Sequence, residues 1–303
     1  MNGLVNGPVS GGGYVRSMPT EPKPHHPLSV LADDPRGRSL GLELPPGALV
    51  PAPGRGRGRR APLLWISDEP VGPGVLAAHR ELPALAAAGL QAVLLQDRSG
   101  VEGWWEGELT PERMSDPDDH HVEPVLREFW QAVVPDAEEG EKGEELIAPF
   151  GRDWPGLAAA GTPGQDPQEA QDPEGEAARL ADELILTGVL GSPRLALVPA
   201  GRGADVLTAM GWCGPLDHEN DVALVSAVLR SWEERFGARV VALGFDELHV
   251  SVAAPPRTTA GALPVAAEHF AFCPDNVWQG SGSLRAYADE ALVDAAHWAF
   301  WWD

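Results

Sequence analysis

The residues best suited to catalysis by type and spacing are His269, Cys273 and Asp275. His269 and Cys273 stand four positions apart, so they share one face of a helix if the helix continues that far. A thiol beside an imidazole can ionise to a nucleophilic thiolate, and with Asp275 and another histidine the pair could also bind zinc. Pro274 favours a structural role instead, because proline ends the preceding helix and a buried cysteine often packs as a small apolar residue. A zinc site needs three or four ligands, so we predict no metal site here.

Three other motifs are incomplete as ligand sites. Residues 280–283 (Gly-Ser-Gly-Ser) precede a predicted helix whose free amides could bind an anion, but no lysine follows and Ser283 serves equally as a helix cap. Residues 201–203 (Gly-Arg-Gly) begin like a dinucleotide-binding loop, but Val206 stands where the third glycine belongs. Residues 116–121 hold aspartates and two adjacent histidines, which point about 100° apart on a helix and rarely bind one ion. We therefore expect a cap, a turn and a solvated helix start, and no cofactor.

A set of tryptophans forms the second candidate site. Its members are Trp212, Trp232, Trp278, Trp298, Trp301 and Trp302. Tryptophan is costly to leave in water, so we expect most of them in the core. If Trp278 and a terminal tryptophan lie together at the surface, they mark a binding groove, because tryptophan is enriched at interface hot spots. The candidate binding residues are Trp278, Gln279, Trp301 and Trp302.

The charge of the chain narrows its partners. The 303 residues carry a formal net charge of −23, and the acidity is concentrated between residues 97 and 183. Such a surface repels phosphate backbones, so nucleic-acid binding by the folded part is disfavoured. A basic protein partner, or solubility alone, fits the charge better.

The cysteines and the N-terminal residues indicate the cellular compartment in which we expect the protein. Cys213 and Cys273 are the two cysteines of the chain, and they form no CxxC pair. Two separate thiols indicate no disulfide framework and suit a reducing compartment. Residues 1–17 show no basic region followed by an apolar run, and no stretch of about 18 apolar residues occurs. We expect a cytoplasmic protein without a signal peptide or membrane span.

Two segments have the composition of unstructured chain. Residues 1–60 are rich in glycine and proline without any apolar period, so we predict a disordered tail. Its end, residues 54–60, resembles a short RGG-type run that can touch RNA, but a charged linker is the favoured interpretation. Residues 136–193 are acidic and rich in proline and glycine, and they are predicted to form a linker with a short helix near 176–187.

Residues 61–135 are typical of a βαβ-containing region. The expected elements are a strand at 63–66, a helix at 75–88 that Pro83 interrupts, a strand at 90–96 and a helix at 116–134. Strand, helix and strand in about 35 residues predict a right-handed crossover between parallel strands.

Residues 194–303 show the most regular pattern. The expected elements are a strand at 195–198, helices at 204–210 and 221–236, a β-hairpin of strands 239–245 and 248–253, helices at 263–272 and 283–293, and a terminal strand at 298–302. The terminal segment is so rich in aromatic residues that we expect it to be buried in the sheet of this region.

Four strings of the C-terminal region carry a family resemblance. They are residues 231–237 (Ser-Trp-Glu-Glu-Arg-Phe-Gly), 267–275 (Ala-Glu-His-Phe-Ala-Phe-Cys-Pro-Asp), 278–280 (Trp-Gln-Gly) and 300–303 (Phe-Trp-Trp-Asp). Residues 194–303 thereby resemble the C-terminal domain of the domain-of-unknown-function family numbered 4253, which is common in actinobacteria. The resemblance implies no activity, cofactor or partner.

These observations predict an α/β fold, with α+β as the alternative, built on a mixed β-sheet with flanking helices. The expected function is a non-enzymatic protein-binding module, of regulatory or immunity type, for a basic partner. The alternative is an enzyme or metal site built on Cys273, His269 and Asp275.

Overall fold

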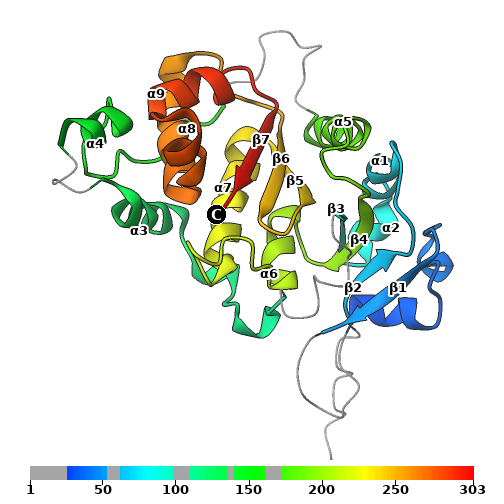
Figure 1. The fold of residues 1–303 in the computed structure, drawn as a ribbon. Helices are drawn as coiled ribbons and strands as arrows, with labels where there is room; N and C mark the ends of the chain where they lie inside the picture. The colour runs from blue at the N-terminus through cyan, green and yellow to red at the C-terminus, as the bar shows by residue number, and fades with distance from the viewer. Residues whose placement is uncertain (1–25, 53–61, 98–108, 136–139, 162–171) are drawn as a thin grey trace, which may run out of the picture.

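The computed structural model describes residues 26–52, 62–97, 109–135, 140–161 and 172–303. Within them, seven strands form one mixed sheet in the order β1-β2-β4-β3-β5-β6-β7 (Figure 1). The strands are β1 (Gly47–Pro51), β2 (Pro62–Ser67), β3 (Leu90–Leu95), β4 (Arg194–Pro199), β5 (Ala238–Leu243), β6 (Glu247–Val252) and β7 (His297–Trp301). The predicted mixed sheet with flanking helices is confirmed.

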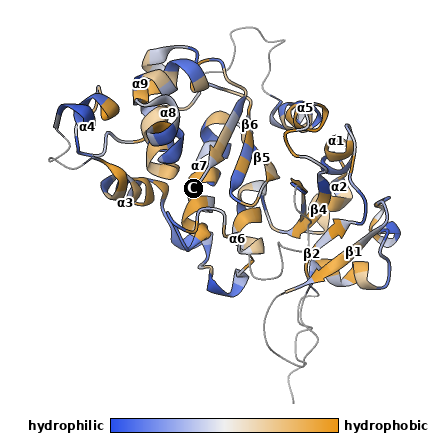
Figure 2. Cartoon of the chain, in the orientation of Figure 1, coloured by the Kyte–Doolittle hydropathy of each residue, from blue (hydrophilic) through white to orange (hydrophobic). Residues whose placement is uncertain are grey.

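The helices cover both faces of this sheet. They are α1 (Val75–Arg80), α2 (Pro83–Ala87), α3 (Val122–Val133), α4 (Gly140–Ile147), α5 (Pro173–Leu186), α6 (Val206–Met210), α7 (Val222–Phe236), α8 (Thr259–Phe272) and α9 (Leu284–Tyr287). Helices α3, α6, α7 and α8 pack one core with one face of the sheet, and α1, α2 and α5 pack a second core with the other. Figure 2 shows apolar residues along the strands between these two layers. No helix of the described residues is long and apolar enough to cross a bilayer.

The strands bury both of their faces because alternate residues belong to different cores. In β3, Val93 and Leu95 face the α7–α8 side, while Ala92 and Leu94 face the α5 side. A strand buried on both faces shows a continuous apolar run rather than alternation. The apolar runs in the sequence therefore predict β2, β3 and β4 correctly.

The predicted βαβ unit is present, but its two strands are not neighbours in the sheet. β2 and β3 do run in the same direction, but β4 lies between them and pairs antiparallel with both. β4 follows β3 by about a hundred residues in the chain, so no local pattern shows its insertion. β3 also pairs in parallel with β5, so a single sheet joins the region at 61–135 to the C-terminal region.

The predicted disordered tail is too long. Residues 26–52 are folded: they form a 3₁₀ turn at Pro27–Ala32 and strand β1. Leu28, Leu31 and Leu42 are buried under the α1–α5 side of the sheet. Short 3₁₀ turns and loops have no apolar period, so composition alone indicates disorder where tertiary contacts give order. Residues 1–25 and the arginine run at 54–60 lie outside the described residues.

Two helix predictions are also refined. Pro83 splits the expected helix at 75–88 into α1 and α2, because a proline ring clashes with the preceding turn. The segment predicted as linker contains α4, and the short helix expected near 176–187 begins earlier, at Pro173. Asp172 caps that helix by accepting from the Gly175 amide at 3.0 Å.

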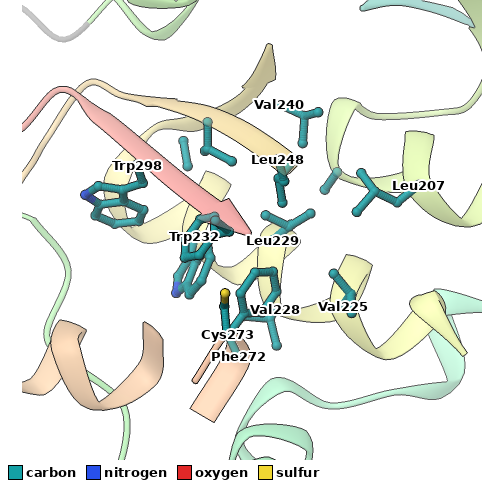
Figure 3. Close-up of a cluster of buried hydrophobic side chains, with 14 of the residues drawn as sticks. Leu207, Val225, Val228, Leu229, Trp232, Val240, Leu248, Phe272, Cys273 and Trp298 are labelled. Atoms are coloured by element: carbon teal, nitrogen blue, oxygen red, sulfur yellow. The ribbon is translucent and has the colours of Figure 1, made fainter. Parts of the chain in front are cut away.

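The C-terminal elements match the sequence expectation closely. Asp221 caps α7 at the Ala223 amide, 3.2 Å away, and Gly237 ends it with φ of 60°. β5 and β6 form the predicted hairpin, and the terminal strand β7 pairs antiparallel with β6 at the edge of the sheet. Trp298 and Phe300 point into the core, while Ala299 and Trp301 are exposed on the other face. Figure 3 shows Trp298 beside Trp232 of α7, and the two ring centroids lie 5.4 Å apart.

Candidate functional site

The structure places Cys273 at the end of α8 as a buried residue with an extended backbone, φ of −146°. Its Sγ donates a hydrogen bond to the carbonyl oxygen of Trp301 at 2.9 Å and lies 3.5 Å from Oδ1 of Asn276. Burial raises the pKa of the thiol to about 12. A thiol that is buried and protonated is a poor nucleophile. Figure 3 shows the sulfur among the side chains of the core.

His269 is buried in the same core and bonds to a different group. Its Nδ1 lies 3.0 Å from the hydroxyl of Tyr287, which also accepts from Nδ2 of Asn276 at 3.0 Å. The rings of Trp298 and Phe300 surround the imidazole, at centroid distances of 4.5 and 4.8 Å. Burial, with the nearby charge of Arg235, holds the pKa of His269 well below its usual value. Such a histidine is neutral, and its side chain is fully buried.

Asp275 lies at the surface beyond the end of α8. Its Oδ1 accepts from Nε2 of Gln279 at 2.8 Å, and its Oδ2 accepts from the amide of Asp303 at 3.2 Å. No hydrogen bond between side chains thus joins any two of the three residues proposed for catalysis. In the part of the chain that the structure describes, no group of three metal-binding side chains is found. The arrangement supports the structural interpretation of Cys273 and His269.

The other motifs also bond locally. Ser283 caps α9 by accepting from the Ala286 amide at 3.2 Å. Asp116 accepts from the Asp118 amide at 3.0 Å, and Nε2 of His120 lies 2.6 Å from Oγ of Ser115. Residues 201–203 form the predicted turn between β4 and α6.

The tryptophans divide into a buried and an exposed group. Trp212, Trp232, Trp298 and Trp302 are buried, whereas Trp278 is 41% exposed and Trp301 is 37% exposed. Trp302 belongs to the core rather than to a binding surface: its ring packs 5.7 Å from that of Trp212, and its Nε1 donates to Phe272 O at 3.4 Å. Of the four candidate binding residues, Trp278, Gln279 and Trp301 are exposed.

Two apolar side chains missed at the sequence level are exposed at the same end of the sheet. Phe245, in the β5–β6 turn, is 59% exposed, and Leu216, in the loop before α7, is 50% exposed. A side chain in the turn of a β-hairpin has few core residues near enough to cover it. The position of Phe245 in the predicted hairpin turn is therefore the sequence signal that could have identified it as exposed. We call Leu216, Phe245, Trp278 and Trp301 the apolar rim.

Hydrogen bonds hold the segments of the apolar rim together. Nε1 of Trp212 donates to Gly244 O at 3.0 Å, which ties the 211–220 loop to the β5–β6 turn. The Trp302 amide donates to Asp246 O at 3.2 Å, which ties the end of β7 to the same turn. The bond from Cys273 to Trp301 then attaches the segment that carries Trp278. In Figure 1, the end of β7, marked C, lies beside α7, in agreement with the stacking of Phe300 on Trp232.

The segments of the apolar rim are acidic. Residues 211–221, 244–247, 273–283 and 297–303 contain no lysine or arginine. They carry the carboxylates of Asp217, Glu219, Asp221, Asp246, Glu247, Asp275 and Asp303. Exposed apolar side chains among carboxylates suit a partner that presents apolar and cationic groups together.

Comparison with known proteins identifies one family. Residues 194–303 match the family described as Domain of unknown function (DUF4253), in agreement with the resemblance of the sequence strings. No curated protein and no solved structure matches the chain. The matched domain contains every segment of the apolar rim.

Proposed function

Since residues 194–303 belong to a family without an assigned activity, we propose a function from the site itself: a non-enzymatic module that binds a basic protein through the apolar rim. The module acts in the cytoplasm, as two free cysteines suggest, in a regulatory or immunity-type role that masks its partner. Its folded part does not bind nucleic acid, because the acidic surface repels phosphates.

One observation carries this proposal: Trp278, Trp301, Phe245 and Leu216 are all exposed in segments that carry carboxylates and no lysine or arginine. A single exposed apolar residue is ordinary, but several large apolar side chains on segments that are hydrogen-bonded to one another are costly to leave in water. Burying one of them under a partner contributes about 1.5–3 kcal/mol. The carboxylates accelerate encounter with a cationic surface and select against an acidic one.

The alternative, an enzyme built on Cys273, His269 and Asp275, has weaker support. Cys273 is buried and bonded to a backbone carbonyl, and His269 bonds to Tyr287 instead of the thiol. Chemistry at this position would need the core to open.

The proposal is tested by quantitative capture from lysate of the native cell, with the full chain as bait. The comparison uses the double variant Phe245→Ala/Trp301→Ala and the control Val30→Ala, whose side chain is 38% exposed beside β1 and β2 at the opposite edge of the sheet. We expect a basic protein that wild type and control retain and the double variant loses. Its purified form should then bind wild type more weakly as salt rises from about 50 to 300 mM.

Two outcomes contradict the proposal. The double variant binds the purified partner as tightly as wild type, or no stoichiometric partner is retained at low salt. If the protein also turns over a metabolite and Cys273→Ala abolishes that turnover, the enzyme alternative is correct.

A further inference from the structure

A cavity of about 340 Å³ lies at the end of β5 opposite the apolar rim. Its lining includes Arg80, Arg202, Arg239, Glu174 and the loop glycines Gly201 and Gly203. We call it the arginine cavity. Its volume falls within the range of about 300–1,000 Å³ that small-molecule sites occupy.

The floor of the arginine cavity is a buried guanidinium. Arg80 has a side chain that is 9% exposed; its Nε donates to Ala92 O at 3.0 Å and its Nη2 to Val240 O. These carbonyls belong to β3 and β5, so the guanidinium bridges the two strands at this end. Nη1 is left 3.7 Å from Oε2 of Glu174, which is beyond hydrogen-bond distance. A buried cation therefore keeps a donor toward the cavity.

Arg239 adds a second cation that is also incompletely paired. Its Nε donates to Oε1 of Glu174 at 2.5 Å and its Nη1 to Ala238 O at 2.8 Å. Its Nη2 donates to no acceptor among the described residues. One carboxylate, that of Glu174 with a side chain 47% exposed, thus serves two guanidinium groups. Over the whole lining three arginines are matched by three glutamates, so the positive excess is confined to these two guanidinium groups.

The loop after β4 adds neutral donors. Gly201 and Gly203 line the same cavity, and the amide of neither donates a hydrogen bond within the described part of the chain. The third arginine and the two remaining carboxylates are already engaged. Glu233 accepts from Nε of Arg202 at 2.8 Å and from the Ala204 amide at 2.9 Å, and Glu234 accepts from both Nη atoms of Arg202 at 3.3 Å. Glu174 is therefore the carboxylate that a ligand would displace.

From these donors we propose that the arginine cavity binds the phosphoryl group of a small phosphorylated molecule. The phosphoryl oxygens replace the Glu174 carboxylate and accept from Nη1 of Arg80, Nη2 of Arg239 and the loop amides. A tetrahedral group with three terminal oxygens matches donors that come from two strands and a loop better than a flat carboxylate does. The space beyond the floor holds the organic part of the ligand. The net charge of the protein is screened over about 8 Å at physiological salt, so the groups nearest the ligand, the two guanidinium groups that share Glu174, decide the attraction.

The test is isothermal titration of the full chain at about 150 mM salt with ribose 5-phosphate, inorganic phosphate, succinate and ribose. Glu174→Gln removes the competing carboxylate and should tighten ribose 5-phosphate binding several-fold. Arg239→Gln should weaken it about tenfold or more. Arg179→Gln is the matched control on α5, because Arg179 pairs with Glu176 and Glu183. Arg80 is left intact because its bonds to β3 and β5 support the fold.

The comparison of the four ligands shows whether the cavity binds a phosphorylated organic molecule or free phosphate. Tighter binding of ribose 5-phosphate than of inorganic phosphate indicates a phosphorylated organic ligand, and equal binding indicates free phosphate. Succinate or ribose binding as tightly as ribose 5-phosphate overturns the proposal. So does the absence of binding by wild type and Glu174→Gln at about 10 mM ligand, or equal affinity in folded Arg239→Gln and wild type.

Discussion

The thiol of Cys273 donates to the carbonyl oxygen of Trp301 across 2.9 Å, and this bond closes the outer edge of the sheet. β7 is the edge strand, and the carbonyls of Ala299 and Trp301 point away from β6. The carbonyl of Ala299 is bonded by Asn276, whose Nδ2 donates to it at 2.8 Å. An open edge is a template for pairing with another chain, so these two side chains protect the strand.

The hydrogen bonds that Asn276 and Cys273 donate to β7 predict how much stability is lost when either side chain is removed. Asn276→Ala leaves the Ala299 carbonyl and the Tyr287 hydroxyl each short of a donor, so we expect a loss of about 1–3 kcal/mol in the free energy of unfolding. Cys273→Ala removes one weaker bond and should cost about 1 kcal/mol. Urea unfolding measures both, and Gln279→Ala at the exposed surface is the control. Equal stability of Asn276→Ala and wild type contradicts the closed edge.

The two cysteines should differ in reactivity. Cys273 is buried with its pKa raised to about 12, while Cys213 is partly exposed beside Thr110, whose Oγ1 lies 3.5 Å from the sulfur. A disulfide reagent at pH 8 should modify one thiol per native chain quickly and the second only after unfolding. Cys213→Ser should remove the fast phase. A fast phase that persists in Cys213→Ser and disappears in Cys273→Ala would show an accessible, activated Cys273.

The features of the fold and of the candidate site that the sequence predicts are those whose physical cause lies in neighbouring residues of the chain. The caps and the apolar spacing of α7 are local, so its bounds were predicted almost to the residue. Whether Trp301 or Trp302 is buried depends on where β7 ends and on what packs against it. Consecutive aromatic residues do not show which one points inward. Phe245 and Arg80 owe their roles to segments distant in the chain, which no spacing rule reaches.

A buried ion pair predicts the largest single loss of stability. Glu268 is fully buried and accepts from both Nη atoms of Arg235, at 2.8 and 2.7 Å, and from Nε1 of Trp232 at 2.7 Å. It also accepts from the Ala158 amide at 2.6 Å, which attaches the segment before α5 to α7 and α8. Glu268→Ala leaves a guanidinium uncompensated and should cost about 3–5 kcal/mol in urea unfolding.

The exposed pair of Arg127 and Glu123 on α3 is the matched control for that substitution. Glu123→Ala should cost less than about 1 kcal/mol, because solvent screens its charge. A similar cost for both variants would mean that the Glu268 carboxylate is hydrated in solution.

The histidine pair on β6 and β7 predicts how stability depends on pH. Nδ1 of His249 lies 3.1 Å from Nε2 of His297, and the pKa of His297 is lowered to about 4 by burial, then by the charges of His249 and Arg179. A histidine in the unfolded chain titrates near about 6.5, so the unfolded state binds the proton first. The free energy of unfolding therefore has its full value above about pH 6.5. It decreases by about 2–3 kcal/mol as the pH falls toward 4, because the unfolded state takes up a proton that His297 in the folded state does not. His297→Gln should flatten the stability profile in that window. Substitution of the exposed His121 by Gln should leave the profile unchanged, and a profile equally steep in His297→Gln and wild type would show that His297 does not set it.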